Sequence, residues 1–326
     1  MSPLRRILVA VKDPWARSLP AVSKAAQIAQ ATGAEIELFH SIADAIYIDA
    51  LGPARRSGAP FQSATCERYL SRLEVVAAPL RRRGLQVHTA AEWDYPVYES
   101  IVRRAVGTKA DLIVAERHAT RHVAPWLLRF TDWELLRLSA IPVLLVKSPR
   151  AYRQPVILAA IDPAHAFAKP SGLDGQILRN ARTMTDALGG KLHAVHAYVS
   201  MPYGLLSAGQ DAASTLKQIQ KHARAQAAAG LKRALRGTRI PPARRHLVDR
   251  HPIDAIHSVA RAIGSAIVVM GAVSRSGIKR AFIGNTAERI LDQLACDVLV
   301  VKGPRFTSDV DRASRGPRLV AGPMVP

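Results

Sequence analysis

The sequence has few cysteines, few aromatic residues and no long apolar run. Its two cysteines, Cys66 and Cys296, form no CxxC motif, so neither a disulfide nor a redox centre is indicated. Aromatic residues make up only 5% of the chain, too few to suggest stacking platforms for single-stranded nucleic acid. No apolar run approaches the roughly 20 residues that span a bilayer, and the short run at residues 7–11 precedes the charged pair Lys12-Asp13 instead of a cleavage site. A cytoplasmic protein is therefore expected.

Acidic residues are also scarce: 25 of them face 46 basic ones, which gives a net charge of +21. Residues 1–150 contribute +7 and residues 151–326 contribute +14. Such an excess favours contact with nucleic acid, acidic lipid or nucleotide phosphate. The basic residues are scattered over several predicted helices and strands, however. A solvated basic surface is therefore the favoured interpretation, and nucleic-acid binding is the less favoured one.

Apolar residues make up 48% of the 326-residue chain, and their pattern alternates between strands and helices. Short β-branched runs at 7–11 and 156–161 end just before Asp13 and Asp162. Each is followed by an amphipathic helical stretch that ends in glycine. The same order of strands and helices then continues in both halves. Alternation of this kind predicts parallel strand pairing in a doubly wound α/β sheet, with five strands in each half.

The two halves are copies of one unit. Residues 110–149 align with residues 265–304 at a constant offset of 155, so that "VLLVK" lies over "VLVVK". A repeat of this length indicates a duplicated domain. We therefore predict one domain at 1–150, a second at 151–304, and a tail at 305–326. The tail is rich in Pro, Gly and Ser and is expected to be a mobile extension; the alternative is that it packs back along the other half.

Ligands of doubly wound sheets bind beyond the carboxyl ends of the strands, which directs attention to the loops after the first and fourth strands of each half. No GxSxG elbow, GxxxxGK[ST] loop or HExxH motif occurs in the sequence. His193 and His196 lie three residues apart in a predicted strand, so they point to opposite faces and cannot share an ion. We predict no catalytic residue and no metal site.

The loop "GAVSRSGIKRAFIGNTAERI" at 271–290 carries a resemblance to the tandem universal stress proteins, closest to the E-type members, that covers residues 4–304. ATP-binding members share Gly, two residues, Gly, nine residues, then Gly followed by Ser or Thr, and an aspartate after the first strand contacts adenine. The resemblance implies that an aspartate reads the base, that two apolar residues wall the adenine and that the loop residues face phosphate. The corresponding positions here are Asp162, Ala197, Met270, Gly271, Ser274, Gly284, Asn285 and Thr286.

Each glycine of this pattern has a physical purpose. Bare backbone lets the chain pass close to ribose and phosphate, and the last glycine lets phosphate approach the amides at a helix N-terminus. Ser274 replaces the second glycine, and its Cβ costs about 1 kcal/mol if the site needs a left-handed conformation. Gly284 keeps the final glycine, and Asn285-Thr286 follows it in place of the hydroxyl residue, although Asn285 remains a good N-cap and hydrogen-bond donor.

The first half has lost the glycines of this loop. The offset of 155 places Glu116 over Gly271 and Arg129 over Gly284, and a carboxylate repels phosphate. We predict that residues 1–150 do not bind ATP in the family manner. They act either as a structural partner or as the host of a different pocket near Trp126, Phe130 and Trp133, residues that core packing also explains.

By resemblance, the chain is a non-enzymatic stress-response or regulatory protein that binds ATP or a related ligand in its second domain, with slow ATP hydrolysis at most. The two fifth strands are expected to pair within the chain, imitating a homodimer; a homodimer of whole chains is left open. The alternative is a carrier or sensor of a lipid-like or other non-nucleotide metabolite. A nucleic-acid-associated basic protein is a less favoured third option.

Overall fold

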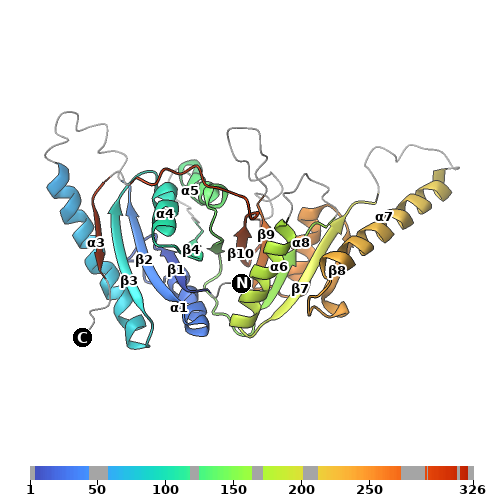
Figure 1. Ribbon diagram of the computed structural model, residues 1–326, viewed down its shortest axis with the longest axis horizontal. Helices are drawn as coiled ribbons and strands as arrows, with labels where there is room; N and C mark the ends of the chain where they lie inside the picture. Colours follow the sequence, from blue (N-terminus) through green and yellow to red (C-terminus); the bar gives the residue numbers. More distant parts are fainter. Residues whose placement is uncertain are drawn as a thin grey trace. The chain divides into compact units, whose positions relative to one another are not determined.

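The computed structural model describes residues 4–43, 58–117, 125–163, 172–200, 212–272, 291, 293–313 and 316–321. The chain forms two compact units (Figure 1). Unit 1 comprises Met1–Arg153 together with Phe306–Pro326, and unit 2 comprises Gln154–Arg305. The tail therefore belongs with the first half of the chain and not with the second half that precedes it.

Unit 1 has a sheet in the order β11-β3-β2-β1-β4-β5. The five strands from β3 to β5 in this order are parallel to one another, and β11 is antiparallel to β3. Its strands are β1 (Arg6–Ala10), β2 (Glu35–Ile42), β3 (Val87–Trp93), β4 (Leu112–Glu116), β5 (Val143–Val146) and β11 (Arg318–Ala321). Its helices are α1 (Pro20–Thr32), α3 (Gly58–Arg82), α4 (Val97–Gly107) and α5 (Pro125–Leu138). The glycine predicted to end the first helix does so: Gly33 follows α1 with a φ of 72°.

Unit 2 repeats this plan with the order β10-β9-β6-β7-β8, and all of its strand pairs are parallel. Its strands are β6 (Val156–Ala160), β7 (Lys191–Tyr198), β8 (Arg245–Asp249), β9 (Ile267–Gly271) and β10 (Asp297–Val301). Its helices are α6 (Leu173–Ala187), α7 (Ala212–Ala234) and α8 (Pro252–Ala262), with a short 3-10 turn, η2 (Pro242–Arg244).

The predicted fold class, α/β with tandem parallel-sheet domains, is confirmed. The short apolar runs form central strands because they are covered on both faces: Ile7, Leu8 and Val9 of β1 are fully buried, and so are Ile267 and Val268 of β9. The offset of 155 also holds in space, since β4 and β9 occupy the same place in their sheets. The pairing of the two fifth strands stays a prediction.

The C-terminal tail corrects one expectation. Residues Arg318–Ala321 do not form a mobile extension but a strand, β11, which pairs antiparallel with β3 at the edge of the unit 1 sheet. Leu319 packs against a buried cluster of Ile42, Cys66, Ala91 and Trp93. The alternative expectation, that the tail packs back on the other half, is the correct one for this segment.

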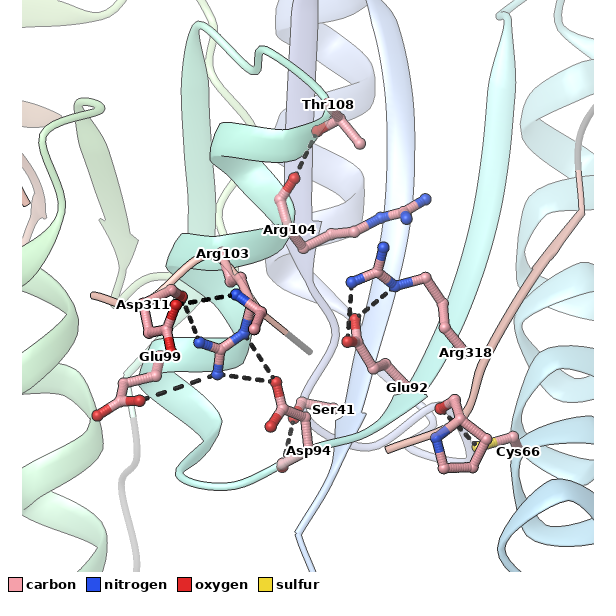
Figure 2. Close-up of polar contacts among 12 residues, drawn as sticks. Ser41, Cys66, Glu92, Asp94, Glu99, Arg103, Arg104, Thr108, Asp311 and Arg318 are labelled. Atoms are coloured by element: carbon pink, nitrogen blue, oxygen red, sulfur yellow. Dashed lines mark hydrogen bonds and ion pairs between the residues drawn. The ribbon is translucent and has the colours of Figure 1, made fainter. Parts of the chain in front are cut away.

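Two contacts outside the strand ladder fix the tail at this edge, and Figure 2 shows the first of them, between Arg318 and Glu92. The Arg318 guanidinium donates to both carboxylate oxygens of Glu92 at 2.9 Å, and Glu92 is fully buried. At the entry to β11, the Trp93 amide donates to the Pro317 carbonyl at 3.0 Å. A Cβ on Gly316 would lie 2.2 Å from the Trp93 carbonyl oxygen, so only glycine fits there.

A buried arginine of α4 links the tail to the interior of unit 1. The Arg103 side chain is 2% exposed and forms an ion pair with Asp94, at 2.9 Å, on the segment after β3. The same guanidinium donates to the Asp311 carbonyl of the tail at 2.5 Å (Figure 2). Buried charges are tolerated when they are paired and hydrogen-bonded in this way. The tail is thus held by charge as well as by backbone pairing.

Candidate functional site

The carboxyl edge of unit 2 brings together four of the eight predicted site residues. Asp162 follows β6, Ala197 lies near the end of β7, and Met270 and Gly271 end β9. These three strands are neighbours in the order β9-β6-β7, and the pairing of Ala160 with Val195 places Asp162 level with Ala197. The other four, Ser274, Gly284, Asn285 and Thr286, lie outside the described residues.

The backbone at Asp162 is fixed by the first turn of the following helix. The Asp162 amide donates to Oδ1 of Asp174 at 3.0 Å, and Asp174 is the second residue of α6. A carboxylate is favourable at a helix N-terminus, where the peptide dipoles leave partial positive charge. The preceding Ile161 amide donates to the Val195 carbonyl at 3.0 Å, which continues the β6–β7 ladder. The half-buried Asp162 side chain therefore extends from a rigid backbone.

Gly271 has a packing role that the sequence did not indicate. A Cβ at this position would lie 2.6 Å from Cδ2 and 2.8 Å from Cγ of Leu173, the first residue of α6. Leu173 is 1% exposed, so it has little room to move away. Close approach of the helix to the strand therefore requires glycine at 271. Its predicted role in admitting phosphate stays a prediction.

The equivalent position in unit 1 contacts its own helix N-terminus through a side chain. Glu116 ends β4, and its Oε1 accepts the amide hydrogen of Ala21 in the first turn of α1 at 3.1 Å. The N-cap residue of that helix, Leu19, supplies no side-chain cap, so the carboxylate satisfies an otherwise orphaned donor. The N-terminus of α1 is therefore already in contact with a negatively charged group, the Glu116 carboxylate. The expectation that unit 1 does not bind phosphate here stays a prediction.

An aromatic cluster lies at the carboxyl edge of unit 1, beyond β1 and β2. Nδ1 of the buried His40 donates to the Val11 carbonyl at 2.8 Å, and the Tyr69 ring stacks on His40 with centroids 4.3 Å apart. Trp15 meets Tyr69 edge-on at 4.8 Å, and Arg68 lies over both rings. These residues come from three separate segments, so no spacing in the sequence could have assembled them.

The predicted aromatic pocket of unit 1 is only partly covered by the structure. The side chains of Trp126 and Phe130 lie outside the description, and Trp133 is half-buried on α5. The Trp15–Tyr69 cluster, which no sequence pattern indicated, lies at the carboxyl edge of unit 1, where ligands of doubly wound sheets bind.

Comparison with known proteins accounts for this duplicated architecture. The model of the "Universal stress protein family" matches residues 3–147 and again residues 156–302. The chain belongs to the universal stress protein family. It contains two family domains in tandem, as the resemblance predicted, and together they cover most of its length.

The relatives are E-type universal stress proteins. The chain is 24% identical to universal stress protein E of Photorhabdus laumondii over 94% of its own length and 98% of the relative. It is 24% identical to universal stress protein E of Escherichia coli K12 over 93% of its length and 96% of the relative. The full-length match confirms the tandem E-type organisation.

Solved structures agree with the fold. A functionally unknown protein from Pseudomonas aeruginosa PAO1 is 24% identical and aligns with a TM-score of 0.69 over 92% of this chain and 93% of the other. A universal stress protein from Archaeoglobus fulgidus is 18% identical and aligns with a TM-score of 0.59 over 95% of this chain and 98% of the other. These likenesses extend across both domains and establish the fold.

The histidines of β7 behave as their spacing predicted. Nδ1 of His193 lies 3.0 Å from Nε2 of His246 in β8, and the two rings stack. His196 has a different partner: its Nδ1 lies 3.3 Å from the Ile161 carbonyl oxygen. Within the described ranges, no group of three or more His, Cys, Asp or Glu side chains is arranged to hold a metal ion. None of the described helices is long and apolar enough to cross a membrane.

Proposed function

We propose that this universal stress protein is a non-enzymatic regulatory or protective module that binds an adenine nucleotide at the carboxyl edge of unit 2 and not of unit 1. The observation that carries the proposal is the contrast between two equivalent edges. Unit 2 presents Asp162, Ala197 and Gly271 at the ends of neighbouring strands. Unit 1 has the Glu116 carboxylate and stacked aromatic rings at the equivalent edge.

The roles follow the chemistry of adenine. The Asp162 carboxylate would accept a hydrogen bond from the exocyclic amine of the base, and the Asp162 backbone amide is held by Asp174. Met270, which is 6% exposed, and the small Ala197 would supply apolar walls. The loop that begins at Gly271 would bring main-chain amides to the phosphates, as the resemblance to ATP-binding family members implies.

A second candidate is a carrier of an amphiphilic, non-nucleotide ligand. One observation favours it: the apolar side chain of Leu173 occupies the space beside Gly271 at this edge. An apolar wall of this kind serves a hydrocarbon ligand as well as a base. The two candidates differ in whether the Asp162 carboxylate is required.

A thermal-shift titration of the full chain with ATP tests the proposal. A ligand that binds only the folded state stabilises it by about 2.7 kcal/mol at 100 times its dissociation constant. Asp162→Ala removes a hydrogen bond to a charged group, which weakens binding by about 10- to 150-fold. At 100 times the wild-type dissociation constant, we therefore expect the stabilisation by ATP to fall from about 2.7 kcal/mol to about 0.3–1.4 kcal/mol in this variant.

The duplication supplies a matched control. Asp13 is the unit 1 counterpart of Asp162, and it is exposed, with Oδ1 accepting the Trp15 amide hydrogen at 2.9 Å. Asp13→Ala should therefore leave the ATP-dependent shift intact. A shift that survives Asp162→Ala but disappears in Asp13→Ala would place the ligand in unit 1 and overturn the proposal. A shift with amphiphiles alone would favour the second candidate.

A further inference from the structure

Helix α7 of unit 2 lies in a stretch with no acidic residue. Residues 212–248 contain nine Lys and Arg side chains and neither Asp nor Glu. Residues 217–222 are exposed without exception, and the N-terminal half of the helix extends beyond the sheet of unit 2 (Figure 1). Among residues 216–234, whose side chains the structure describes, the buried side chains of this helix, Ala227 and Leu231, lie in its C-terminal half. Residues 217–222 therefore present the charges of Lys217 and Lys221 to solvent.

Four of the basic side chains form a stripe along this helix. Lys217, Lys221, Arg224 and Lys232 are spaced by four, three and eight residues, which places them within about 80° around the helix axis. All four are exposed. Within the described part of the chain, no carboxylate forms an ion pair with them. At about 1.5 Å per residue, the stripe is about 22 Å long.

The duplicated counterpart in unit 1 lacks this property. Helix α3 carries Glu67 and Glu74 among its basic residues. Glu74 binds Arg81 in an ion pair with oxygen–nitrogen distances of 2.5 and 3.0 Å, which holds the pKa of Glu74 below its usual value. The two helices follow equivalent strands, yet only α7 is free of acidic residues. The uncompensated charge is thus a property of one copy and not of the fold.

We infer that the exposed face of α7 is a binding surface for the phosphate backbone of double-stranded nucleic acid. A duplex carries one negative charge per about 1.7 Å of its axis with both strands counted, so a length of 22 Å carries about 13 phosphate charges, more than the four basic side chains of the stripe can pair with. The surface contains no aromatic residue, so it reads no bases by stacking. An anionic membrane fits less well, because Ile219 is the only large apolar side chain exposed on the described part of α7 and interfacial helices need an apolar face.

The test is binding of the full chain to a fluorescently labelled 24-base-pair duplex between 50 and 200 mM salt. Replacing the four stripe residues by Gln removes four charges from a helix whose propensity Gln preserves. Loss of four phosphate contacts makes the slope of log affinity against log salt shallower by about 3.6. The loss of affinity between 50 and 200 mM salt should then be about 150-fold smaller in the variant than in the wild type. The charge-keeping changes Lys217→Arg, Lys221→Arg and Lys232→Arg should retain the wild-type slope.

The control removes four exposed charges from unit 1 by changing Arg82, Arg83, Arg150 and Arg153 to Gln. Both quadruple variants should keep the wild-type circular dichroism and melting temperature. A reduced slope in the α7 variant alone supports the inference. Three results overturn it: no duplex binding by the wild type at 50 mM salt, an equal loss in the control variant, or binding only to vesicles of anionic phospholipid.

Discussion

Adding one methyl group at Gly271 should destabilise unit 2 without touching any ligand. The new Cβ in Gly271→Ala would meet three atoms of Leu173 at 2.6, 2.8 and 3.0 Å. Ordinary carbon–carbon contact is about 3.5–4.0 Å, so helix α6 or its side chain must move by about 1 Å. Overpacking of a well-filled core costs about 1–3 kcal/mol. We expect a loss of that size in the local stability of unit 2.

A double-mutant cycle isolates this contact. Leu173→Ala alone creates a cavity and costs about 2–5 kcal/mol. In that background the methyl group added by Gly271→Ala finds space, so the second substitution should cost nothing further, and the coupling energy should be about 1–3 kcal/mol. Because the chain has two units, the assay should be local. Hydrogen exchange of peptides from α6 and β9 reports the opening of unit 2 alone.

Gly107→Ala serves as the control, because a Cβ there meets nothing within 4 Å. It should change the exchange of α4 peptides by less than about 0.5 kcal/mol. The packing interpretation is refuted if Gly271→Ala leaves α6 and β9 fully protected. If the same variant also abolished the ATP-dependent thermal shift, the glycine would be kept for the ligand and not for Leu173.

Two further predictions concern unit 1. Arg318→Gln leaves the buried Glu92 without its ion pair, and because the Arg318 side chain is 35% exposed, we expect a loss of about 2 kcal/mol of local stability. Amide hydrogen exchange of residues 318–321 should become about 30-fold faster, whereas the control Val320→Thr on the same strand should leave the exchange rate unchanged. Burial lowers the pKa of His40, so the unfolded chain binds the proton more tightly, and His40 contributes stability above about pH 6.5 that is lost as the pH falls below it. His40→Gln should flatten urea-unfolding stability between pH 7.5 and 5.5 relative to wild type; an unchanged pH dependence would contradict this assignment.

Much of the fold could be predicted because its causes are local. Runs such as residues 7–11 are apolar throughout, and only a strand covered on both faces buries all of their side chains. The constant offset of 155 then required the second half to repeat the first. Pro252 likewise begins α8 because its fixed φ suits a first helical turn.

The remaining features depend on contacts between distant segments. The sequence "RLVA" at 318–321 is too short to predict a strand, and it becomes one because Glu92 and the open edge of β3 receive it. The bond from Glu116 to Ala21 joins residues 95 apart. The alignment of the two halves showed that Glu116 replaces a glycine of the phosphate loop, but only the structure shows that its carboxylate accepts the amide hydrogen of Ala21.

The two copies differ at the last residue of the fourth strand, Glu116 in β4 and Gly271 in β9, and the same packing requirement acts on both. Each copy must pack that position against the first turn of the helix that follows its first strand. Unit 1 does so with the Glu116 carboxylate, which accepts the amide hydrogen of Ala21, whereas unit 2 does so with the bare Cα of Gly271 against Leu173. The first solution adds a carboxylate at this strand end, and the second adds none beyond Asp162 and Asp174, which lie at the same edge. We therefore expect a phosphate group to meet less repulsion at the Gly271 backbone than it would meet at Glu116.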